Sequence, residues 1–68
     1  PPPPIRVRLL VPYERQEVVA RLHREADILS LEATDSGTLL EVRLDERQLA
    51  WARDFLAEPL TRELRLPG

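Results

Sequence analysis

Apolar and polar residues alternate along residues 5–11, where the apolar positions on one side are Ile5, Val7, Leu9 and Val11. A period of two with β-branched residues predicts a strand that buries one face, and Pro12 ends it. The period then becomes helical over residues 14–26, where one arc carries Val18, Val19, Leu22 and Ala26. The chain is therefore predicted to begin with a strand and an amphipathic helix.

Two further strands and a second helix are predicted after this helix. Residues 28–34 read as a strand that turns Leu29, Leu31 and Ala33 inward, and residues 38–44 as one that turns Leu40, Val42 and Leu44 inward. The segment between them, 35–38, is a turn in which Gly37 is free to take a positive φ. The two strands therefore form a hairpin.

The second helix is predicted to start at Asp45, because Gln48 stands three residues later as a capping box requires. Its buried stripe is Leu49, Ala52, Phe55 and Leu56, with Trp51 on the rim. Pro59 ends this helix, and residues 60–66 are predicted to add a short last strand.

The element order is β-α-β-β-α, with the final β over 60–66. This order predicts an α+β fold, the ferredoxin-like split βαβ, in which two helices cover one face of a small antiparallel sheet. We expect residues 1–4 to be the proline-rich end of a linker, 5–66 a single domain and 67–68 a tail. One core is expected to contain Leu9, Leu22, Leu31, Val42, Leu49 and Phe55.

Composition narrows the function. The chain has 68 residues, 43% hydrophobic and 32% charged, with a net charge of −2, which is typical of a globular domain without general attraction to nucleic acid or anionic lipid. Because it begins with Pro1 and contains no Met, we interpret it as a piece of a longer protein. The lack of Cys fits a cytosolic protein, no membrane span is predicted, and abundant Arg without Lys or Asn suits a heat-tolerant source.

No catalytic, cofactor or metal site is predicted. Gly37 and Gly68 are the only glycines, so a phosphate-binding loop is missing. His23 is the only histidine, and its place beside the apolar arc of the first helix favours a solvent-flanking residue. Among the carboxylates, Glu17 and Arg21 are expected to form an ordinary helix-surface pair.

Five residues are candidates for contact with a partner. Arg6, Arg8 and Arg43 fall on outward strand positions, where they could contact phosphates. They alternate there with Glu32, Glu41 and Glu63, which predicts cross-strand ion pairs. Base stacking is not expected, because no aromatic lies inside a predicted strand. Tyr13 and Trp51 are each either a packed residue of the domain or a contact for a protein partner.

The segment Val7-Arg8-Leu9-Leu10-Val11-Pro12-Tyr13, with Leu22-His23 and the later turn at Gly37, resembles the C-terminal domain of HflX-family GTPases. In that family a hydrophobic strand ends in Pro-Tyr, and a helix and a hairpin with a Gly turn follow. The resemblance covers about residues 5–56.

The resemblance implies a parent GTPase that uses GTP and magnesium, acts in the cytoplasm and binds the large ribosomal subunit to split or rescue stalled ribosomes. This domain would then be a non-catalytic docking module near the stalk base, where it meets ribosomal RNA and a ribosomal protein. A second hypothesis stays open, since ferredoxin-like folds also serve as regulatory domains for ligand sensing or self-association.

Overall fold

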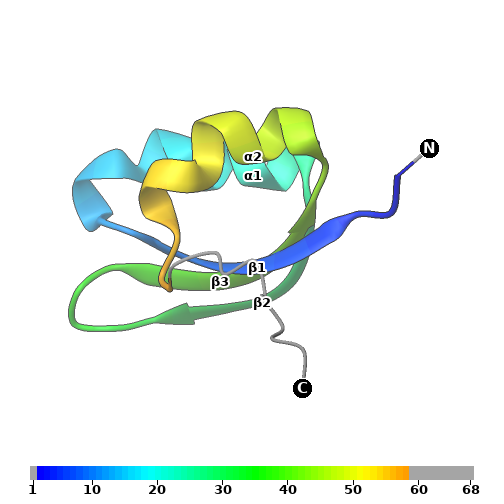
Figure 1. The fold of residues 1–68 in the computed structure, drawn as a ribbon. Coiled ribbons are helices and arrows are strands. Elements are labelled where there is room, and N and C mark those ends of the chain that lie inside the picture. The colour runs from blue at the N-terminus through cyan, green and yellow to red at the C-terminus, as the bar shows by residue number, and fades with distance from the viewer. Residues whose placement is uncertain (1, 59–68) are drawn as a thin grey trace, which may run out of the picture.

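The structure is a computed structural model that describes residues 2–58. A three-stranded antiparallel sheet and two helices make up the described chain (Figure 1). The elements in chain order are β1 (Ile5–Val11), the 3₁₀ turn η1 (Tyr13–Arg15), α1 (Gln16–Glu25), β2 (Asp27–Ala33), β3 (Thr38–Leu44), α2 (Glu46–Ala52) and the 3₁₀ turn η2 (Arg53–Phe55). The strand order is β1-β3-β2, and both helices cover one face of the sheet. The predicted α+β ferredoxin-like arrangement is confirmed.

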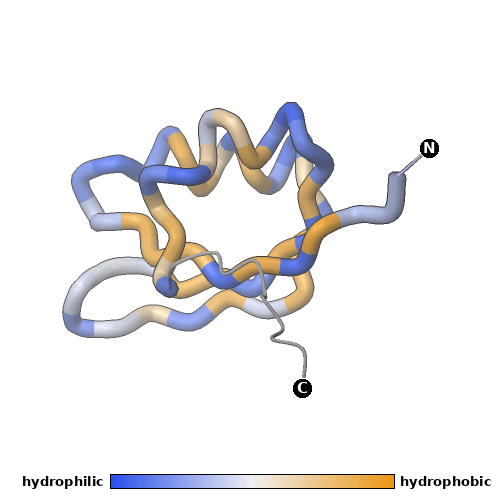
Figure 2. The backbone as a smooth tube through the Cα atoms, in the orientation of Figure 1, coloured by the Kyte–Doolittle hydropathy of each residue, from blue (hydrophilic) through white to orange (hydrophobic). Residues whose placement is uncertain are grey.

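The core lies between the sheet and the helix layer, where apolar residues of both line the interior (Figure 2). Alternate residues of β1 and β3 point toward the helices because successive side chains of a strand leave on opposite faces. The largest fully buried side chains are Leu9, Leu22, Leu40, Leu44, Val11 and Val42. The predictions of burial for Leu9, Leu22, Val42 and Leu49 are confirmed.

Local hydrogen bonds set the start of α2 as the sequence predicted. Asp45 Oδ1 accepts from the Gln48 backbone N–H at 2.7 Å, and Gln48 Oε1 accepts from the Asp45 backbone N–H at 2.8 Å. This reciprocal pair is a capping box, which satisfies two backbone N–H donors that have no acceptor within the helix. The first helix is shorter than predicted, because residues 13–15 form η1 and Ala26 is extended.

The prediction that β2 buries Leu29 and Leu31 is wrong. Leu29 is 38% exposed and Leu31 is 49% exposed. A register shift between Ile28 and Ser30 breaks the alternation, so that Ile28 faces Val42 on the buried side while Leu29 is the extra residue. Leu31 does share its face with Leu40, but β2 is an edge strand that the helix layer covers only in part. Ala33 is exposed as well.

Phe55 was predicted to lie in the core and is only partly buried against it. The reason is that α2 ends at Ala52, and the next three residues form η2, which changes the direction of the Phe55 side chain. The Arg15 guanidinium lies 5.4 Å from the centre of the Phe55 ring and covers it. A cation over an aromatic face stabilises the seam between the two helical segments.

After η2 the chain returns to the sheet along β1. Leu56 forms a bridge with Leu9, and the Ala57 N–H donates to the Arg8 carbonyl at 2.8 Å. This antiparallel contact lies on the edge of β1 that β3 does not occupy. The strand predicted over 60–66 lies outside the described residues.

Candidate docking surfaces

The open sheet face is the side of the sheet turned away from the helices. On β1 and β3 it carries Arg6, Arg8, Leu10, Leu39, Glu41 and Arg43, the residues that alternate with the buried ones. Arg6 stands opposite Arg43 in the register, and Arg8 stands opposite Glu41. The structure thus brings together the three arginines that the sequence placed on one face.

Each of these arginines pairs with a carboxylate. Arg6 Nε donates to Glu41 Oε2 at 2.7 Å, Arg8 Nη1 to Glu58 Oε2 at 3.0 Å, and Arg43 Nε to Asp27 Oδ2 at 2.9 Å. Cross-strand pairing was predicted, and Glu41 is confirmed as a partner. Within the described residues Glu32 forms no ion pair with these arginines, and Arg43 pairs with Asp27 instead. Glu63 lies outside the described residues.

These ion pairs shape the electrostatics of the open sheet face. The hydrogen bond from Arg6 holds the pKa of Glu41 below its usual value, and the same bond raises the pKa of Arg6. The face is close to neutral because a carboxylate offsets each guanidinium. Exposed ion pairs contribute little to stability, since water screens both partners. Loss of one of these ion pairs should therefore cost the domain little stability.

Tyr13 lies away from the open sheet face, at the corner between β1 and α1. Tyr13 is 47% exposed, yet its hydroxyl donates to the Thr34 carbonyl at 2.5 Å. Thr34 begins the β2–β3 turn, where its N–H and its hydroxyl both donate to the Gly37 carbonyl, at 2.9 and 2.8 Å. Tyr13 therefore ties the end of β1 to the hairpin turn.

Gly37 belongs to the same corner. Its φ is +153°, and a Cβ at this position would lie 2.4 Å from the Val11 carbonyl oxygen. The turn therefore packs against the end of β1 so closely that only glycine fits. The Pro-Tyr motif and the glycine turn, which carried the family resemblance in the sequence, are two halves of one structural contact.

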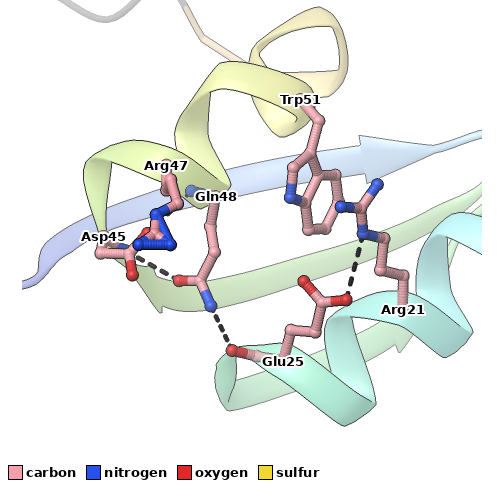
Figure 3. Close-up of a pocket in the computed structure, with 6 residues that line it drawn as sticks. All are labelled: Arg21, Glu25, Asp45, Arg47, Gln48 and Trp51. Carbon is pink, nitrogen blue, oxygen red and sulfur yellow. Dashed lines mark hydrogen bonds and ion pairs between the residues drawn. The ribbon is translucent and has the colours of Figure 1, made fainter.

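Trp51 lies on α2, in the helix layer (Figures 1 and 3). The three arginines lie on the open sheet face, which is turned away from that layer. Trp51 is partly buried against the core, and the Arg21 guanidinium lies 4.0 Å from the centre of its ring. The prediction that Trp51 sits at the rim of the buried stripe is confirmed. The five candidate residues thus occupy three separate places.

Sequence reasoning missed the groove beside Trp51. The groove runs between α1 and α2, and its lining residues are Arg21, Glu25, Asp45, Arg47, Gln48 and Trp51 (Figure 3). Arg21 was expected to pair with Glu17, but its Nε donates to Glu25 at 3.3 Å, while Glu17 accepts from Arg15 at 2.7 Å. The feature of the sequence that could have indicated the groove is the i, i+4 spacing of Arg21 and Glu25, which predicts an ion pair between them on the helix that Trp51 faces.

The described residues show few other chemical groups of note. No three His, Cys, Asp or Glu side chains within 2–58 lie close enough together to hold a metal ion. His23 Nδ1 lies 3.2 Å from the Val19 carbonyl of its own helix. Neither helix in this part of the chain has the length and apolar character that crossing a bilayer requires.

Comparison with known proteins supports the resemblance drawn from the motifs. Over 53 residues, or 78% of its length, the chain is 40% identical to the GTPase HflX of Akkermansia muciniphila. The chain spans only 12% of the length of that relative. No protein-family model matches the chain. The similarity to an HflX GTPase, which the sequence motifs indicated, is thus confirmed.

Proposed function

We propose that this chain is the non-catalytic C-terminal docking domain of an HflX-like GTPase and that it helps the parent bind the large ribosomal subunit. The similarity to a small part of a GTPase supports an accessory role within a larger protein. In this proposal the parent binds GTP and magnesium outside residues 2–58, and the partners are ribosomal RNA and a protein of the stalk base. Docking would serve the splitting or rescue of stalled ribosomes.

One observation carries the docking proposal: the register places Arg6 directly opposite Arg43 and next to Arg8 on an exposed sheet face. Guanidinium groups donate two parallel hydrogen bonds to the oxygens of a phosphate, as they also do to those of a carboxylate. Phosphates of an RNA strand would replace Glu41, Asp27 and Glu58 as partners. Because the carboxylates compete, binding by the isolated domain should be weak and should fall steeply with salt.

The parent would compensate for weak binding by the domain. A second binding site on the same molecule raises the local concentration of the domain near the ribosome. Docking is therefore expected to be measurable in the full-length parent even where the isolated chain binds poorly.

The test is pelleting of the full-length parent with large ribosomal subunits at low and at moderate salt. Arg6→Glu, Arg8→Glu and Arg43→Glu combined should reduce pelleting at both salts and should make the remaining binding less dependent on salt, because fewer phosphates are neutralised. The matched control reverses Arg24 and Arg53, which are exposed in the helix layer. If the triple reversal pellets as well as the unaltered parent at both salts, the open sheet face is not the docking surface.

Self-association is a second candidate function, which the exposed edge of β2 favours. Six of its seven residues are exposed, among them Leu29 and Leu31. An edge strand with apolar side chains is a template for pairing with another strand. Sedimentation equilibrium of the 68-residue chain tests this function. The chain should form a dimer, and the Leu31→Glu variant should be a monomer. A monomer at every concentration contradicts it.

A further inference from the structure

The outer edge of β2 is the sheet edge along which no other segment of residues 2–58 lies (Figure 1). The other edge, on β1, already carries the return segment 56–58. We propose that two copies of this chain join through their β2 edges as antiparallel strands, with Leu31 of one copy directly opposite Leu31 of the other. This inference rests on self-association, the second candidate function, and adds its geometry. It does not depend on ribosome docking, which uses the open sheet face.

The backbone groups that point outward from β2 belong to Leu31 and Ala33. In an antiparallel pair, successive residues direct their N–H and C=O groups alternately toward the neighbouring strand and away from it. The Thr34 N–H donates to the Gly37 carbonyl at 2.9 Å, so Thr34 and the residue two positions before it, Glu32, face β3. The residues between them and before Glu32 therefore present donors and acceptors to a further strand.

The pairing of β1 gives the same alternation independently. The Arg8 carbonyl accepts a bond from the return segment 56–58, so the next residue, Leu9, directs its backbone groups to its β3 partner Leu40. Leu40 thus faces β1, and the residues on either side of it face β2, where one of them is paired with Glu32. Both ends of the sheet place the backbone bonds of Glu32 inside the domain and those of Leu31 outside it.

The side chains of this edge favour association. Leu31 is 49% exposed and Leu29 is 38% exposed, and Ala33 is exposed as well. Leu31 stands on the face that the helices cover, opposite Leu40, but at the margin of that cover. Pairing with another strand would remove apolar surface from water, which is the main driving force of association. An exposed edge of this kind, without a lysine or a proline to block it, is a template for strand addition.

The sequence of the edge is complementary to itself in one register. With Leu31 opposite Leu31, Ser30 of each copy stands opposite Glu32 of the other, where a hydroxyl can donate to a carboxylate. A shift of two residues one way would set the two Glu32 carboxylates directly opposite each other, which is unfavourable. A shift the other way would set Leu31 opposite Leu29, the extra residue of the bulge, where the ladder is disrupted. A second copy therefore fits this edge without an opposed pair of like charges.

The arrangement closes at two copies. A two-fold axis through the Leu31 pair uses the β2 edge of both copies at once, so that each patch meets its own equivalent. The β1 edges that remain carry the return segments 56–58 and do not extend the sheet. Because one pair of strands makes a small interface, the dimer should be reversible and should depend on the protein concentration.

The register can be tested with single cysteines, because the chain has no cysteine of its own. The variants are Leu31→Cys, Ala33→Cys and, as a control on the exposed surface of α1, Arg24→Cys. In the proposed register the two Cα atoms at position 31 lie about 5.5 Å apart, which a disulfide can span. The two Cα atoms at position 33 are offset by four residues, or at least about 13 Å, which a disulfide cannot span.

Each variant is oxidised at a concentration where sedimentation equilibrium shows the dimer, and covalent dimers are counted on a non-reducing gel. Leu31→Cys should cross-link at least about tenfold faster than Ala33→Cys and Arg24→Cys, because the dimer holds its two thiols together. In urea the three rates should become similar, which controls for the reactivity of each thiol. Circular dichroism checks that each variant is folded, and all three positions are exposed.

Two results overturn the proposal, and they have different consequences. A chain that stays monomeric at every concentration removes self-association together with this inference. A dimer in which Leu31→Cys cross-links no faster than Ala33→Cys or Arg24→Cys removes the Leu31 register alone, and self-association through another arrangement stands. Pelleting with ribosomal subunits tests docking separately from both.

Discussion

Replacing Gly37 by alanine should destabilise the domain, because the hairpin turn lies too close to the end of β1 to admit a Cβ atom. The added Cβ would lie 2.4 Å from the Val11 carbonyl oxygen, 2.9 Å from the Val11 carbonyl carbon and 3.0 Å from the Pro12 Cα. All three are backbone atoms, so no side-chain rotation relieves the contact. The backbone φ of +153° adds a cost of about 1–3 kcal/mol for a residue other than glycine.

The total loss for Gly37→Ala should therefore reach at least about 3 kcal/mol, from backbone strain together with the displacement of β1 from the turn. A domain of this size has roughly 3–10 kcal/mol of stability, so much of the population would unfold. Urea unfolding followed by Trp51 fluorescence and by circular dichroism measures the difference in free energy of unfolding.

Ser36→Ala is the matched control, because Ser36 is exposed in the same turn and uses only its backbone N–H there. It should change stability by less than about 0.5 kcal/mol. A loss below about 1 kcal/mol for Gly37→Ala would show that the turn can move away from β1, and the close contact would then not explain why glycine stands here.

Three further predictions test the packing and the ion pairs. Leu22→Ala should cost about 3–5 kcal/mol and Leu31→Ala less than about 1 kcal/mol in urea unfolding, because the first side chain is fully buried and the second is 49% exposed; similar losses would contradict the edge position of β2. Tyr13→Phe should cost about 1 kcal/mol, the usual worth of one hydrogen bond, and no loss would mean that the corner does not need the hydroxyl. The pKa of Glu41 is lowered from 4.5 by the bond from Arg6, so its contribution is present above pH 4.5 and is lost as the pH falls through the folded value. Glu41→Gln should therefore flatten the acid side of the stability profile, and parallel profiles for both proteins would refute the pairing.

Local patterns in the sequence determined most of the fold. Alternation predicted β1 and β3 with the correct inward residues, because the direction of a strand side chain depends only on its position in the pleat. The spacing of Asp45 and Gln48 predicted the start of α2, because a capping box closes within four residues. The order of these elements was enough to predict the ferredoxin-like arrangement.

The outward position of Arg6, Arg8 and Arg43 was also readable from the sequence, for the same reason as the inward position of their neighbours. Their partners were less predictable. The carboxylate that each arginine meets depends on strand register and on where the chain returns after α2, so Glu58 joins Arg8 from 50 positions away.

Only the tertiary structure decided what covers each face. Periodicity states which side chains share a face of β2, but not that a bulge shifts the pattern or that the helices leave Leu31 half exposed. The corner of Tyr13 and Gly37 and the groove around Trp51 each join segments far apart in the sequence. Such contacts follow from how the layers pack, which no local pattern of residues encodes.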